Sequence, residues 1–154
     1  MKTKIKMLLS MLFLCIGLNA QEKSNAIEKN AFVEWNFGVA HIYDEAIFPG
    51  TSVLWGKTYI TENNFVIEYE GGFALPTIVT GKFGIGKKFN NTKFVAGLRP
   101  FPFNVFIQSS FTNGKKGYWI CSVEYNPLHY DSTLAFHSKA IFNVGYRWHI
   151  FKDK

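Results

Sequence analysis

The run Phe142–Ile150, near the end of the printed sequence, constrains the fold of this chain more than any other segment. Its even positions are all large and apolar or aromatic: Phe142, Val144, Tyr146, Trp148 and Ile150. The odd positions between them hold asparagine, glycine, arginine and histidine. Side chains on a β-strand point alternately to its two faces, so this segment predicts a strand with one apolar face and one polar face.

The first twenty residues have the layout of an export signal. Three lysines among the first six residues precede an apolar run from Met7 to Leu18, and the small residue Ala20 stands at the expected cleavage point. The apolar run is about a dozen residues long, whereas a membrane-spanning helix needs roughly 20. We therefore expect residues 1–20 to be a cleaved signal peptide and the remainder to act outside the cytoplasm.

Composition limits the remaining functions. Removing 20 of the 154 residues leaves 134, enough for one domain, and lowers the net charge from +6 to about +3. That charge is too small and too scattered to indicate a nucleic-acid partner. Cys121 is the only cysteine beyond the signal, so no internal disulfide is expected. No later apolar run approaches the length of a spanning helix, so any membrane crossing would have to use strands.

The rest of the chain divides into a leader and a β-domain. Residues 21–30 are polar and unpatterned, which predicts a flexible leader, and residues 31–151 hold the expected β-barrel domain. Runs of alternating residues separated by turn residues predict eight strands. They are Ala31–Tyr43, Thr51–Ile60, Asn64–Gly72, Ile78–Lys87, Lys93–Arg99, Phe103–Phe111, Gly117–Tyr125 and Ala140–Phe151. The fold class is therefore all-β, a single antiparallel up-and-down barrel of about eight strands.

The alternation assigns each side chain to one of two faces. The apolar face includes the five residues of the last strand, which we predict to face lipid. The opposite face holds the charged residues that we predict to form an ion-pair network in the lumen: Glu34, Lys57, Glu68, Glu70, Lys82, Arg99, Glu124 and Arg147. Four acids balance four bases, as buried charges require. The facing of the second strand is ambiguous in sequence, and we assign Lys57, and with it Trp55, to the lumen.

A soluble barrel, with its aromatic residues inside and its charged residues outside, would show the same alternation of apolar and polar residues. Two points favour the membrane orientation. An eight-stranded barrel has an interior just wide enough to be filled by side chains, and about two dozen mostly large apolar residues exceed that space. A soluble outer face should also be rich in lysine and glutamate, whereas the polar face here is rich in glycine. The strands are close to the 9–11 residues that a tilted strand needs to cross a bilayer.

The export signal and the alternating strands, above all the closing run from Phe142 to Ile150, resemble those of small outer-membrane barrels of Gram-negative bacteria, the OmpX/OmpA-like class. The signal end Asn19-Ala20-Gln21 is similar to that of Bacteroidetes exports. Such barrels usually end on an aromatic residue in phase with the lipid face, whereas Ile150 holds that phase here and Phe151 is out of phase. The resemblance implies an outer-membrane protein with a structural or surface-interaction role.

Catalytic and metal chemistry find little support in the sequence. Some eight-stranded barrels are lipid A deacylases that use a histidine and a serine near the last strand, with one residue between them. Here His137 and Ser138 are adjacent, so on a strand they would point to opposite faces. The four histidines lie at no metal-binding spacing. We therefore expect no enzyme, no cofactor and no metal.

The preferred interpretation is a monomeric, non-enzymatic outer-membrane barrel with a filled, charge-paired lumen. Its partners would be outer-membrane lipid and, through its outer loops, a surface partner. Two alternatives remain open. One is a soluble exported carrier, periplasmic or secreted, with Phe142 and Trp148 inside around an apolar ligand. The other is a narrow pore, which the many glycines of the polar face would allow.

Overall fold

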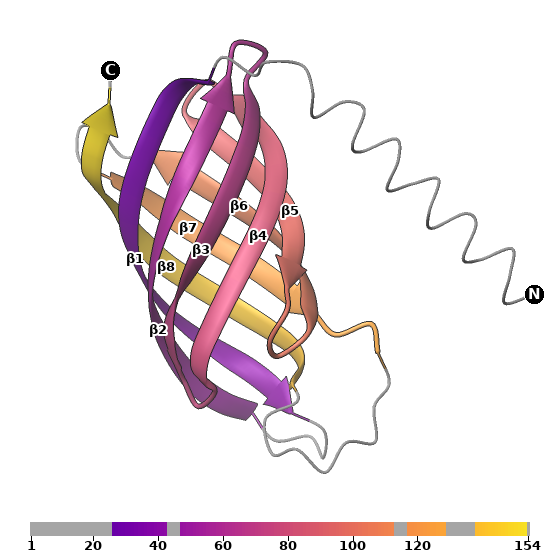
Figure 1. The fold of residues 1–154 in the computed structure, drawn as a ribbon. Coiled ribbons are helices and arrows are strands. Elements are labelled where there is room, and N and C mark those ends of the chain that lie inside the picture. The colour runs from indigo at the N-terminus through magenta and orange to yellow at the C-terminus, as the bar shows by residue number, and fades with distance from the viewer. Residues whose placement is uncertain (1–25, 43–46, 113–116, 129–137, 154) are drawn as a thin grey trace, which may run out of the picture.

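A computed structural model describes residues 26–42, 47–112, 117–128 and 138–153 of the chain. Eight strands close into one barrel in which each strand pairs with its neighbours in sequence and β8 pairs with β1 (Figure 1). The strands are β1 (Ala26–Ile42), β2 (Ile47–Thr61), β3 (Phe65–Leu75), β4 (Ile78–Phe89), β5 (Thr92–Arg99), β6 (Asn104–Thr112), β7 (Gly117–Tyr125) and β8 (Ser138–Asp153). All eight pairings are antiparallel, which confirms the predicted up-and-down barrel.

The strand register fixes the tilt of the strands and the width of the barrel. The partners of Lys29, followed once around the barrel, return to β1 at Val39, ten residues further along. The path runs through Tyr59, Ile67, Ile85, Ala96, Ile107, Val123 and Phe142. Eight strands with a stagger of ten residues tilt by about 40° to the axis and leave an interior that side chains can fill.

The two ends of the barrel differ in their connections. At one end, which we name the turn end, β1 begins and β8 ends, and residues 62–64 and 90–91 join β2 to β3 and β4 to β5. Asn64 and Asn90 adopt positive φ angles of 59° and 48° there, a conformation that asparagine tolerates in tight turns. At the other end, the loop end, lie the connections from β1 to β2, β3 to β4, β5 to β6 and β7 to β8.

Three adjacent strands are longer than the rest. β8, β1 and β2 have 16, 17 and 15 residues, whereas β5, β6 and β7 have 8, 9 and 9. The predicted boundaries were too narrow here: β1 begins at Ala26, so residues 26–30 belong to the barrel and not to the leader. β2 likewise begins at Ile47 and includes Pro49, which pairs with Val39 where a turn was predicted.

Burial along the strands follows the predicted alternation, except that the facing of β2 is reversed, and gives the barrel an inverted distribution of polarity. Among the described residues, eighteen buried side chains are polar or charged and eight are hydrophobic, while thirty large hydrophobic side chains are exposed. The apolar side chains therefore cover the outside, and the polar side chains fill the inside.

The predicted facing of the second strand was wrong. The β1–β2 register runs without a break from Glu28↔Ile60 to His41↔Ile47, so β1 fixes the facing of β2. Glu34, which is fully buried, pairs with Leu54, and Val33 pairs with Trp55. Leu54 and Ile60 therefore point inward, while Trp55 and Lys57 are exposed on the outer face. The sequence of the strand alone left this facing ambiguous, and the pairing with β1 decides it.

No helix in the described part of the chain is long and apolar enough to span a membrane.

Candidate functional site

Arg147 on β8 is the centre of the buried charge network. It is fully buried, and its guanidinium group meets three carboxylates. Nε and Nη2 lie 2.8 Å and 2.5 Å from Glu34 Oε2, Nη1 lies 2.7 Å from Glu68 Oε2, and Nη2 lies 3.2 Å from Glu70 Oε2. The planar guanidinium, with its five N–H donors, suits this three-sided arrangement better than an ammonium group would. Arg147 therefore links β8 to β1 and, across the lumen, to β3.

Glu68 on β3 extends the network toward the turn end. Its Oε2 accepts hydrogen bonds from Thr58 Oγ1 at 2.8 Å and Lys93 Nζ at 3.3 Å, and its Oε1 accepts one from Gln108 Nε2 at 3.2 Å. Lys93 is 2% exposed, and its ammonium group also lies 4.9 Å from the centre of the Tyr118 ring. One carboxylate thus holds side chains from β2, β5, β6 and β8 in a single cluster. We name the charged set Arg147, Lys93, Glu34, Glu68 and Glu70 the turn half of the network.

Glu124 on β7 organises the part nearer the loop end. Its Oε1 lies 2.7 Å from Arg99 Nη2, 3.1 Å from Lys82 Nζ and 3.1 Å from Asn143 Nδ2. Lys82 also lies 3.5 Å from Glu70 Oε1, which connects the two clusters. We name the set Arg99, Lys82 and Glu124 the loop half. The loop half has two cations and one carboxylate, whereas the turn half has two cations and three carboxylates.

Apolar side chains complete the filling of the lumen. The Phe32 ring lies 3.6 Å from the guanidinium carbon of Arg147, so this cation is stacked as well as paired. Gly56 leaves the space for that ring, because a Cβ at position 56 would lie 2.5 Å from Phe32 Cζ. A cluster of buried apolar side chains fills more of the interior: Ile60, Val66, Val95 and Phe106. The interior thus holds apolar side chains beside the charged network.

Seven of the eight residues predicted for the lumen are buried inside the barrel and take part in this network: Glu34, Glu68, Glu70, Lys82, Arg99, Glu124 and Arg147. The eighth, Lys57, is exposed on the outer face, and the prediction for it was wrong. Lys93 takes its place as the fourth cation. The alternation that placed Arg99 inside also places Lys93 inside, six residues earlier on the same strand, so the sequence contained the signal.

The five residues predicted for the apolar face of the last strand lie on the outside of the barrel. Phe142, Val144, Trp148 and Ile150 are 43–47% exposed, and Tyr146 is half-buried. Tyr146 lies between two tryptophan rings, with ring centres 5.3 Å from Trp119 and 5.0 Å from Trp148. Phe142 and Trp148 therefore point away from the interior, opposite to the facing that a soluble carrier requires.

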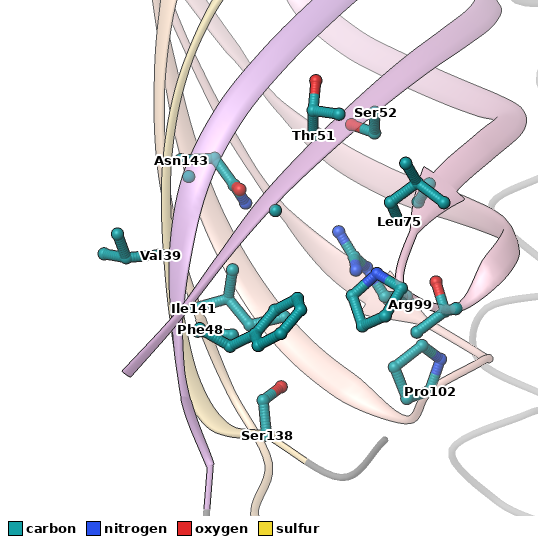
Figure 2. Close-up of a pocket in the computed structure, with 16 residues that line it drawn as sticks. Val39, Phe48, Thr51, Ser52, Leu75, Arg99, Pro102, Ser138, Ile141 and Asn143 are labelled. Carbon is teal, nitrogen blue, oxygen red and sulfur yellow. The ribbon is translucent and has the colours of Figure 1, made fainter. Parts of the chain in front are cut away.

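A pocket opens at the loop end of the lumen (Figure 2). It offers about 60 Å³ to the centres of water-sized molecules. Figure 2 shows Arg99 and Asn143 pointing toward one another from opposite sides of it, both of them contacts of Glu124. The pocket arises because the β2–β3 ladder ends at Thr51↔Leu75, whereas β2 continues along β1 to Ile47 and leaves the wall uneven.

Two further observations limit the chemistry. Within the described ranges, no three histidine, cysteine, aspartate or glutamate side chains are grouped so as to hold a metal ion. His137, the histidine of the deacylase-like pair, lies outside the described residues, and Ser138 is the buried first residue of β8. No protein-family model, curated protein or solved structure matches the chain.

Proposed function

We propose that this protein is a membrane-spanning β-barrel of a bacterial outer membrane, with a plugged lumen and a non-enzymatic, structural or surface-interaction role. One observation carries the proposal: most of the thirty large hydrophobic side chains that are exposed among the described residues lie on the outer face of the strands, around an interior rich in buried charged and polar groups. Monomeric soluble proteins rarely expose contiguous apolar patches of more than a few hundred Å². A barrel in lipid needs this inverted distribution.

The extent of the outer apolar surface supports the proposal. The band reaches around the whole barrel, because every strand contributes exposed apolar side chains to it. With the strands tilted by about 40°, some eleven residues span a band about 25 Å tall, the height known for outer-membrane barrels. β1 to β4 and β8 have at least eleven residues, while β5, β6 and β7 have 8, 9 and 9. Tyrosine and tryptophan side chains lie on its outer surface near the turn end, among them Tyr59, Trp119 and Trp148. Such amphipathic rings suit the membrane–water interface.

The lumen network supports a plug in preference to a pore. Arg147, Glu34 and Glu124 are fully buried, and the ion pairs cross the interior between strands on different sides of the barrel. An open channel would require these pairs to separate in the interior, where unpaired charges are costly. We expect the protein, reconstituted into planar bilayers, to show no stepwise conductance. Regular single-channel steps would contradict the plug and favour the narrow pore.

Membrane fractionation of the full chain, expressed in a Gram-negative host, tests the location. We expect the protein to sediment with outer membranes, to resist extraction by salt and alkali, and to migrate faster in gels when unheated than when boiled. The shift arises because a folded barrel stays compact in detergent until it is heated. A soluble periplasmic protein without this shift would contradict the proposal.

A substitution pair tests the lipid-facing assignment separately. Val144 lies near the middle of the outer band, whereas Phe65 is the first residue of β3 at the turn end, and both are exposed. An arginine at the mid-bilayer depth costs about 2–4 kcal/mol, but only about 0–1 kcal/mol near the interface. We therefore expect Val144→Arg to reduce folding into lipid vesicles strongly and Phe65→Arg to reduce it little. Equal effects in vesicles would contradict a membrane-buried outer face.

A further inference from the structure

Lys57 is a cation on the apolar outer face of the barrel, and its neighbours on that face carry no negative charge. It is exposed, and its ladder partners are Ala31 on β1 and Tyr69 on β3. On its own strand, Trp55 and Tyr59 lie on the same face, two residues to either side. None of these four side chains is acidic. A cation in apolar surroundings is costly unless it is paired, so Lys57 calls for a negative charge from outside the barrel.

Two tyrosine hydroxyl groups meet beside this lysine. The rings of Tyr59 and Tyr69 are stacked, with their centres 6.0 Å apart, and their hydroxyl oxygens lie 3.4 Å from one another. Tyr69 is 43% exposed, and Tyr59 is half-buried. When one hydroxyl donates to the other, the second keeps its proton for another acceptor. An ammonium group and a phenolic donor are therefore available side by side to one anion at the surface.

An apolar hollow lies next to this cluster, on the side toward the loop end. Gly71 is the ladder partner of the exposed Trp55 and also of Gly81, so both glycines lie on the outer face. A Cβ at position 71 would meet only Thr80 O, at 3.7 Å, apart from its chain neighbours, so the surface there is open. The rings of Trp55 and Phe73, with centres 6.2 Å apart, stand beside it. The hollow begins two residues, or about 7 Å, along β3 from the tyrosine pair.

We propose that this surface binds an anionic glycerophospholipid. The phosphate accepts hydrogen bonds from Lys57 Nζ and from a hydroxyl of the tyrosine pair, and an acyl chain lies over Gly71 beside Trp55. Charge-assisted hydrogen bonds are stronger than neutral ones, and lysine side chains near a membrane surface attract anionic lipids. The inference rests on the proposed function, because it requires the outer face to be in lipid. The short turns of such barrels are periplasmic, so the lipid would come from the periplasmic leaflet.

Native mass spectrometry tests the proposal on protein purified in maltoside from outer membranes of a host that expresses the full chain. After detergent exchange has removed the native lipid, phosphatidylglycerol and phosphatidylcholine with the same acyl chains are added in equal amounts. We expect the barrel to retain phosphatidylglycerol at least about fivefold more than phosphatidylcholine. Equal retention by the folded barrel would overturn this inference and leave the proposed function standing. Absence of the protein from outer membranes would contradict the proposed function, and with it this inference.

A pair of lysine variants tests whether the preference arises at this surface. Lys57→Gln should reduce the preference for phosphatidylglycerol to less than about twofold. Lys87→Gln is the matched control, because Lys87 is also exposed near the turn end but has Phe65 and Phe94 as ladder partners. The control should keep the preference. Equal losses in the two variants would show that positive charge in general attracts the lipid, which would overturn the assignment to Lys57.

Two further changes test the hydroxyl groups and the hollow. The double variant Tyr59→Phe/Tyr69→Phe keeps both rings but removes the phenolic donors, and it should retain several-fold less phosphatidylglycerol. Gly71→Leu fills the hollow and should also reduce retention, whereas Ala96→Leu, at an exposed position on β5, should not. The heat-dependent gel shift shows whether each variant folds. Unchanged retention in the folded double variant and in folded Gly71→Leu would overturn the placement of the lipid on this surface.

Discussion

The turn half and the loop half of the lumen are built from the same eight strands by the same alternation, yet they differ in how completely their charges are satisfied. In the turn half, Arg147 contacts three carboxylates and Glu68 has partners on four other strands. In the loop half, two cations share one carboxylate oxygen beside a pocket, and Arg99 Nε has no partner among the described residues.

The difference indicates that the two halves contribute unequally to the stability of the barrel. A buried network is stabilising and specific when every member is satisfied, and a partly satisfied one is costly unless a ligand or water completes it. The turn half has the features of a structural plug, whereas the loop half leaves Arg99 Nε and Glu124 Oε2 without a hydrogen-bond partner among the described residues. The backbone also differs along the axis, because at the loop end the β2–β3 ladder stops at Thr51↔Leu75 while β2 continues along β1 to Ile47.

Removal of the central arginine tests this comparison with the largest expected effect. Arg147→Met leaves Glu34, Glu68 and Glu70 buried without their shared cation, and breaking a buried ion pair in this way costs about 3–5 kcal/mol. Arg99→Met should cost clearly less, because Glu124 keeps Lys82 and Asn143. Urea unfolding in micelles, followed by tryptophan fluorescence, measures both losses. If Arg99→Met were as destabilising as Arg147→Met, the two halves would not differ in the way we describe.

Lys93 gives a smaller effect within the turn half. Lys93→Met keeps the length of the side chain but removes its hydrogen bond to Glu68 and its contact with the Tyr118 ring. Hydrogen bonds to charged groups contribute about 1.5–3 kcal/mol, so we expect a loss in that range in the same unfolding experiment. Glu68 keeps Arg147, Thr58 and Gln108, which is why the loss should stay below that of Arg147→Met. A loss equal to that of Arg147→Met would show that no single cation dominates the cluster.

Turn chemistry also differs between the two ends. At the turn end, asparagines occupy the positive-φ positions 64 and 90, whereas at the loop end Ile78, with φ of 67°, occupies one directly after Pro76 and Thr77. A β-branched residue is strained there, by roughly 1–2 kcal/mol. Ile78→Asn should therefore raise the free energy of unfolding by about 1 kcal/mol in detergent, and Ile78→Val should not. A loss of stability in Ile78→Asn would mean that the exposed isoleucine contributes more through its apolar contacts than its backbone costs.

Much of the fold could be predicted because alternation and turn residues are local signals. Phe142 to Ile150 gave the strand type and facing of β8, and Glu34 and Arg147 followed as inward residues. The partners of Glu34 and Arg147 in the lumen could not be predicted. They depend on the ten-residue stagger of the barrel, which follows from the pairing of all eight strands and not from the sequence of any one of them. The pocket escaped prediction for the same reason, since it depends on where the β2–β3 ladder stops relative to β1.

For Lys57 the local sequence led to the wrong facing, and the pairing register of β2 with β1 shows that the side chain lies on the outer face. Val53, Trp55 and Tyr59 lie on the same face of the strand as Lys57. The sequence therefore allowed two interpretations: a lysine buried in the lumen, or a lysine within a mostly apolar outer face. The structure places Lys57 outside, four residues before the end of β2 at the turn end.

Lys57→Gln therefore tests the corrected facing with the smallest effect. A surface substitution away from buried contacts usually changes stability by less than about 0.5 kcal/mol, and we expect Lys57→Gln to fall in that range in micelles. Lys93→Gln, the same change at a buried position, should destabilise the barrel measurably, because it weakens the ion pair with Glu68. If the two substitutions cost the same, the facing of β2 relative to β1 would have to be reconsidered, and with it the assignment of Lys93 as the fourth cation of the lumen.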